Sequence, residues 1–82
     1  EIEAALSGHL LISRHKDEPG VIAAISSVMA DNHINISRMQ LGIVNGGDQA
    51  VAVIEVSHAL DEKQLEKIKG LAAITSVMQV TI

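Results

Sequence analysis

The chain has 82 residues, of which 48% are apolar and 20% charged, and its formal net charge is −4. This length allows one small domain, and the composition is typical of a packed globular domain and excludes intrinsic disorder. The chain contains no Cys, Phe, Tyr or Trp, which excludes disulfides, thiolate metal sites and cysteine nucleophiles and leaves a thin aliphatic core that self-association would help to complete.

A lead-in, a strand and the start of a helix open the chain. Residues 1–8 read as a polar connector that ends in glycine, and residues 9–15 read as a short strand. Pro19 fits the first turn of a helix, where its missing N–H is not needed, with Asp17 or Glu18 as the helix cap.

The helix and a hairpin follow. Apolar residues recur at three- and four-residue spacing from residue 21 to about residue 32, which predicts an amphipathic helix. Residues 34–42 predict a second strand, and the Asn-Gly-Gly-Asp run at 45–48 predicts a tight reversal. Residues 50–57 are rich in β-branched side chains and nearly unbroken, so we expect a central strand covered on both faces.

A second helix and a last strand complete the pattern. Asp61 is expected to cap the helix, with Gln64 completing a capping box and Gly70 at the end. Residues 74–82 alternate like a strand. The order β-α-β-β-α-β predicts an α+β, ferredoxin-like fold with a four-stranded antiparallel sheet and two helices on one face. The second strand would form an edge, which favours a homodimer by edge-strand pairing.

Several functions are excluded by what the chain lacks. RNA recognition on this topology needs aromatic rings and a basic surface, so no nucleic-acid partner is expected. Two carboxylates in the first loop would repel a phosphate substrate, and no serine has an evident base, so we expect no catalytic residue. No apolar run approaches the roughly 18 residues of a membrane span, so no membrane partner is expected.

We also expect neither a metal site nor a cofactor in this domain. His9 and His15 lie about 20 Å apart at strand rise, too far to chelate one ion, although a metal shared across a dimer stays open. His9, His33 and His58 are expected at the surface. The three methionines, Met29, Met39 and Met78, are expected to fill the core.

The first loop has the chemistry of a receptor for a zwitterion. The start of the first helix offers free N–H groups to a carboxylate, and Gly20 carries no side chain that would block them. Asp17 can accept hydrogen bonds from an ammonium group, and His15 can donate or accept beside it. Asn35 opens the next strand with an amide that does both. A small amino acid fits this set of groups.

The same residues carry a family resemblance. The run RHKDEPGVIAAISSVMADNHINISRMQLG, followed by GGDQAVAVIEV, resembles the ACT domain, the amino-acid-sensing module attached to many metabolic enzymes, over residues 9–82. The His-x-Asp-x-Pro-Gly loop and the Ile-Asn-Ile strand look most like the C-terminal domains of D-3-phosphoglycerate dehydrogenase and of iron–sulfur-dependent L-serine dehydratase. Both enzymes handle serine.

The resemblance implies a ligand and its contacts. The serine-contacting positions of the family fall on His15, Asp17 and Asn35, although many members carry Asn where this chain has Asp17. An arginine common in the family is Ile43 here, so no basic contact is expected from that position. The expected ligand-binding residues are His15, Asp17, Pro19, Gly20, Val21, Asn35 and Ile36.

The resemblance also implies regulation. In this family the ligand lies between two subunits. It is contacted by the first loop of one chain and by the strand that Asn35 opens, either in the neighbouring chain or in the same chain. Because the first residue is Glu rather than Met, we expect the chain to be an excised piece of a longer protein. The resemblance implies a catalytic domain on the N-terminal side, and a cytoplasmic location is the default expectation. Serine would inhibit a dehydrogenase or activate a dehydratase.

Simpler interpretations of these residues stay open. His15 could be a solvated residue at a strand end, Asp17 a helix cap and Asn35 a turn residue. The alternative to a sensor is a ligand-free dimerisation or assembly module of a metabolic enzyme.

Overall fold

The computed structural model describes residues 8–82; residues 1–7 of the expected lead-in lie outside this range. Residues 8–82 form four strands, two α-helices and one short 3-10 turn. In order they are β1 (His9–Lys16), α2 (Val21–Asp31), β2 (Ile36–Val44), η1 (Asn45–Gly47), β3 (Gln49–Val56), α3 (Glu62–Lys69) and β4 (Ile74–Thr81).

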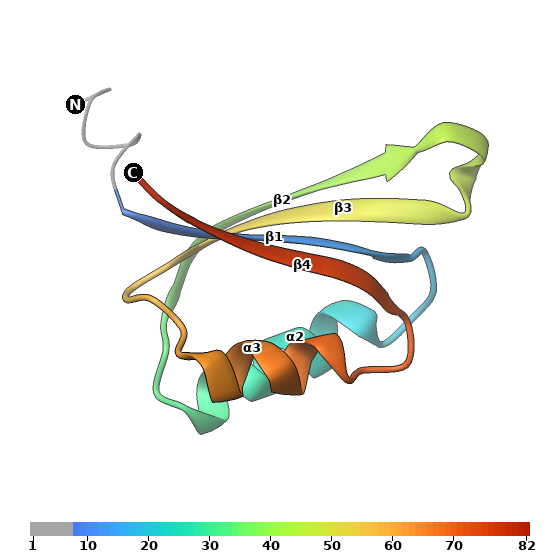
Figure 1. Cartoon of the computed structure of the whole chain (residues 1–82). Coiled ribbons are helices and arrows are strands. Elements are labelled where there is room, and N and C mark those ends of the chain that lie inside the picture. Colours follow the sequence, from blue (N-terminus) through green and yellow to red (C-terminus); the bar gives the residue numbers. More distant parts are fainter. Residues whose placement is uncertain (1–7) are drawn as a thin grey trace.

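The four strands form one antiparallel sheet in the order β2-β3-β1-β4. Both helices cover the same face of that sheet, and the opposite face is open (Figure 1). The predicted ferredoxin-like fold is therefore confirmed. The order also makes β2 an edge strand, as the sequence predicted.

The core lies between the sheet and the helices. Alternate residues of β3, namely Ala50, Ala52, Ile54 and Val56, are buried, since successive side chains of a strand point to opposite faces. The buried apolar residues of α2, of the connection after it, of α3 and of the loop before α3 pack against them: Val21, Ile25, Val28, Met29, Ile34, Leu60 and Ile68. The spacing of the apolar residues in α2 was readable from the sequence because helix period fixes which positions share a face.

The predicted cap of α3 is also confirmed. The Gln64 N–H donates to Asp61 Oδ1 (2.8 Å), and the Asp61 N–H donates to Gln64 Oε1 (2.9 Å), which is a complete capping box. Gly70 follows as the C-terminal cap. Such caps depend on residues three positions apart, so local sequence was enough to predict them.

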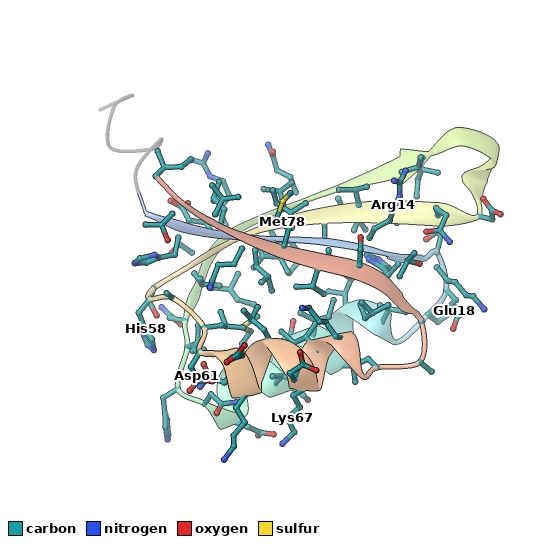
Figure 2. All side chains as sticks on the ribbon, in the orientation of Figure 1. Arg14, Glu18, His58, Asp61, Lys67 and Met78 are labelled. Atoms are coloured by element: carbon teal, nitrogen blue, oxygen red, sulfur yellow. The ribbon has the colours of Figure 1, made fainter. Side chains whose placement is uncertain are left out.

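Two predictions about burial are wrong. β3 is central but covered on one face only, because both helices lie on the same side and its other residues, such as Val51 and Val53, stay half-buried. Met78 is 57% exposed and projects from the open face, as does Arg14 (Figure 2). Met29 is buried and Met39 half-buried, as expected. Of the three histidines expected at the surface, His33 and His58 are exposed and His9 is half-buried.

Candidate functional site at the start of helix α2

The loop between β1 and α2 ends in a glycine that caps the helix. Gly20 has φ +90°, and no side chain of the described residues makes a capping hydrogen bond to α2. The predicted caps, Asp17 and Glu18, are therefore wrong, and Pro19 precedes the helix instead of lying in its first turn. The physical reason is that Gly20 makes the left-handed turn into the helix, which a residue with a side chain rarely adopts.

This arrangement leaves the start of α2 open to a ligand. The first intrahelical hydrogen bond runs from the Ala24 N–H to the Gly20 carbonyl oxygen (3.0 Å), so the N–H groups of the first turn have no partner within the helix. No acidic residue lies in that turn. The unpaired N–H groups and the helix dipole together favour an anion such as a carboxylate.

A pocket of about 260 Å³ lies at this end of the helix. Its walls come from the loop, from the first turns of α2 and from the segment that leads into β4: Glu18, Pro19, Gly20, Val21, Ala24, Leu71, Ala72 and Ala73. The predicted residues Pro19, Gly20 and Val21 thus line one pocket. The Lys16 N–H donates to the Ala73 carbonyl oxygen (2.9 Å), which ties the end of β1 to the opposite wall.

His15 is buried directly before this pocket-forming loop. Its side chain is only 2% exposed, so the interpretation as a solvated strand-end residue is wrong. Within the described residues its Nδ1 atom has no hydrogen-bond partner. Leaving a buried polar atom unpaired costs about 1–3 kcal/mol, so such an atom calls for a functional or structural explanation.

The same strand face carries a second buried polar residue that the sequence analysis missed. Ser13 is fully buried, and its Oγ atom also has no partner among residues 8–82. Parity along β1 places Ser13, His15 and the core residue Leu11 on one face. That parity was readable from the sequence, but the burial of this end of the strand was not.

Asp17 lies outside the pocket but close to the hairpin. Its side chain is exposed, and its N–H donates to the Asp48 carbonyl oxygen (3.1 Å) in the turn between β2 and β3. The loop is therefore held toward the β2 side of the sheet. A carboxylate in this place is free to accept hydrogen bonds from an ammonium group.

Asn35 lies at the other end of the molecule. It directly precedes β2, where its N–H donates to Ser57 Oγ (3.0 Å) and its carbonyl oxygen accepts from the Ser57 N–H (2.9 Å). His15 pairs with Ala50 on β3, and Ser57 lies seven residues further along the chain. At strand rise this separation is about 23 Å.

One copy of the chain therefore does not bring His15 and Asn35 together. Helix α2 carries the chain from one end of the sheet to the other (Figure 1). Glu18, in the first loop, and His58, next to Ser57, lie at opposite ends of the molecule (Figure 2). The option that a ligand touches the loop and the Asn strand of the same chain is wrong, and Ile36, beside Asn35, shares that distance.

A larger hollow lies on the sheet itself. It has a volume of about 500 Å³ and is lined by Gln40, Leu41, Gly42, Val51 and Val53. It contains no charged group that would hold an ammonium or a carboxylate. The pocket at α2 is smaller, but it combines free N–H groups with a nearby buried histidine, so it is the better candidate site for an amino acid.

The described residues show neither a metal-binding cluster nor a membrane-spanning helix. Residues 8–82 contain no cluster of three or more His, Asp or Glu side chains arranged to hold a metal ion. None of the helices within that range is long and apolar enough to cross a membrane.

Gly20 gives a direct test of the loop geometry. We expect Gly20→Ala to lower the free energy of unfolding by about 1–2 kcal/mol, because a residue with a Cβ atom is strained at positive φ. The added methyl group itself meets no atom within 4 Å. Urea denaturation measures the change. Gly42→Ala is the control, because Gly42 has neither positive φ nor a close neighbour; equal losses in both variants would contradict the role given to φ.

Comparison with known proteins decides the family. The family model described as "ACT domain" matches residues 9–73. This chain belongs to the ACT domain family. The resemblance seen in the sequence is therefore confirmed, and the chain is a regulatory domain of the ACT type.

Relatives of this ACT domain are parts of enzymes. D-3-phosphoglycerate dehydrogenase 3, chloroplastic, from Arabidopsis thaliana is 33% identical over 73 residues, which are 89% of this chain and 12% of that protein. The probable L-serine dehydratase, beta chain, from Bacillus subtilis is 30% identical over 80 residues, 95% of this chain and 36% of that protein. The chain thus spans about an eighth to a third of the length of these relatives.

Solved structures agree with the fold of the ACT domain. A homoserine dehydrogenase from Thiobacillus denitrificans superposes with a TM-score of 0.68 and 29% identity over 92% of this chain and 17% of that one. The ligand-free regulatory subunit of aspartate kinase from Thermus thermophilus gives a TM-score of 0.68 at 19% identity, over 90% of this chain and 51% of that one. The second likeness concerns the fold alone.

Proposed function

We propose that this ACT domain senses a small amino acid, best matched by L-serine, and controls an attached enzyme of serine metabolism. The observation that carries the proposal is the pairing of an uncapped α2 N-terminus with a histidine that is buried directly before the pocket-forming loop. The names of the relatives, phosphoglycerate dehydrogenase and L-serine dehydratase, support the choice of serine.

The groups around the pocket match the two charges of an amino acid. The ligand carboxylate would accept hydrogen bonds from the free N–H groups of the first turn of α2, where the helix dipole favours negative charge. The ammonium group would point out of the pocket and donate to Asp17, which lies outside the pocket in the same loop. Pro19 and Val21 supply apolar walls, and the absence of a Gly20 side chain leaves the approach open. A small ligand is favoured because the pocket holds about 260 Å³.

A second copy of the chain would complete the site with Asn35. If two β2 edges pair antiparallel about a two-fold axis, the start of each β2 meets the end of the other. The end of β2 is at the His15 end of the sheet, because Ile43 and His15 are both opposite Ala50. Edge pairing would thus bring the partner's Asn35 toward the loop between β1 and α2. Of the predicted ligand residues in that loop, Asp17 is held nearest to the β2 edge.

The consequence would be allosteric control without catalysis or a cofactor in this domain. Ligand shared between two protomers would strengthen their association, and that change would pass to a catalytic domain in a cytoplasmic parent enzyme. Coupling is reciprocal and amounts typically to about 1–3 kcal/mol, so substrate binding would change serine affinity by the same factor. The expected effect is inhibition in a dehydrogenase and activation in a dehydratase.

A thermal-shift scan against the twenty amino acids tests the proposal. We expect L-serine at millimolar concentration to raise the melting temperature, because a ligand that binds only the folded state stabilises it by mass action. Calorimetry then measures the affinity. The alternative, a ligand-free dimerisation module, predicts a melting temperature that responds to protein concentration and to none of the amino acids.

A further inference from the structure

Ser13 and His15 present two buried polar atoms to the same small region of the core. Ser13 is 0% and His15 2% exposed, and neither Ser13 Oγ nor His15 Nδ1 has a partner among residues 8–82. Buried polar atoms are almost always hydrogen-bonded to protein or to ordered water. Two such atoms on one strand face therefore point to a shared partner.

The flanking strands offer neither atom a polar side chain as a partner. The side chains opposite these two residues on the flanking strands are all apolar: Ala50, Ala52, Ile74 and Val77. The Cβ atoms of residues i and i+2 on a strand are about 7 Å apart. A hydroxyl and a ring nitrogen span that gap directly after rotation, or through one water whose two hydrogen bonds cover about 5.6 Å.

The direction of this hydrogen bond follows from the requirement that each buried donor has an acceptor. If Nδ1–H donated to Ser13 Oγ, the hydroxyl proton would have no acceptor among the apolar neighbours. If the hydroxyl donates, both the proton and the Nδ1 lone pair are satisfied, directly or through one water. A neutral imidazole carries its single proton on the nitrogen that is not accepting, so the proton then resides on Nε2.

We propose that Ser13 is a positioning residue that holds His15 in the tautomer protonated at Nε2. The ring then offers a fixed N–H donor instead of a mixture of donor and acceptor. For the ligand, this step rests on the proposed function: an Nε2–H donor suits an acceptor such as the carboxylate or hydroxyl oxygen of an amino acid. The role of Ser13 toward the ring itself needs no ligand.

The test is ¹⁵N NMR of the imidazole rings in the ligand-free chain, at a pH where the rings are neutral. The chain has four histidines, and His15→Gln identifies the signals of His15. We expect wild-type His15 to show an unprotonated Nδ1 and a protonated Nε2. In Ser13→Ala these two signals should move toward each other as the tautomers mix, and Ser13→Thr, which keeps the hydroxyl, should restore them.

The matched control is Ser27→Ala, which removes an exposed hydroxyl from α2 and should leave the His15 signals unchanged. A wild-type ring protonated at Nδ1 would overturn the proposal whether or not any variant folds. Identical His15 signals in wild type and a folded Ser13→Ala variant would overturn it as well.

Calorimetry with L-serine separates this proposal from the proposed function. Loss of the fixed donor should weaken binding by about fivefold in Ser13→Ala, the effect of one hydrogen bond, with recovery in Ser13→Thr. If wild type binds no serine while its ring signals depend on Ser13, the positioning role stands and the ligand assignment fails. If serine binds and the ring signals ignore Ser13, the positioning role fails and the sensor stands.

Discussion

Mixing the His15→Ala and Asn35→Ala variants should restore serine binding to about a quarter of the sites, although neither variant should bind serine alone. The reason is that His15 and Asn35 lie at opposite ends of one chain and would meet only across the proposed dimer. A mixed dimer has one intact site and one site that lacks both residues. Random mixing makes about half of the dimers mixed, and each of these contributes one of its two sites.

Calorimetry on the unfolded, mixed and refolded variants measures the recovered stoichiometry. Each variant refolded alone is the control and should bind no serine. Absence of recovery in mixtures that contain mixed dimers, shown by mass spectrometry, would contradict the shared site. Strong binding by either variant alone would contradict the assignment of that residue.

The double variant Leu41→Glu/Ile43→Glu should be a folded monomer with greatly weakened serine binding. Leu41 and Ile43 are 52% and 57% exposed, and they lie on the helix side of the edge strand β2, opposite buried alanines of β3. If the two β2 edges pair about a two-fold axis perpendicular to the sheet, the helices of both protomers lie on the same face of the joined sheet. The partner would then cover the side chains of Leu41 and Ile43. Burial of such a side chain contributes about 1.5–3 kcal/mol, and losing both should raise the dimer Kd at least about a hundredfold.

Sedimentation equilibrium measures that dimer Kd, and calorimetry measures serine affinity in the same samples. Met78→Glu is the matched control, because Met78 is also 57% exposed but lies on the open face of the sheet. It should leave both quantities unchanged. A dimer that survives the β2 variant and dissociates in the Met78 variant would mean that the open face, not the edge, joins the protomers.

The sequence predicted the fold well because its signals are local. The capping box of Asp61 and Gln64 depends on a spacing of three residues, and the apolar stripe of α2 depends on helix period. The Asn-Gly-Gly-Asp run marked the reversal between β2 and β3 for a similar reason, since glycine accepts the positive φ that a tight turn requires. Six elements in a fixed order then leave few topologies to choose from.

The errors all concern burial or direction, which depend on distant parts of the chain. The loop before α2 is held by the Asp48 carbonyl oxygen, so Asp17 is drawn to the hairpin and does not cap the helix. Met78 alternates like a core residue, but nothing in the alternation says which face of the sheet the helices cover. For the same reason, the sequence alone could not show that Ser13 is buried.

The sequence by itself thus determined the elements, their order, the edge position of β2 and the residue types of the proposed amino-acid site, because propensity, spacing and motif act over a few positions. Only the tertiary structure decided that His15 is buried, that Gly20 caps α2 and that Asn35 lies about 23 Å from the loop at strand rise. Those properties arise from the packing of segments far apart in the chain. The distance between His15 and Asn35 arises because α2 and its flanking loops return the chain toward the other end of β1 (Figure 1), and it is why the proposed sensor site needs two chains.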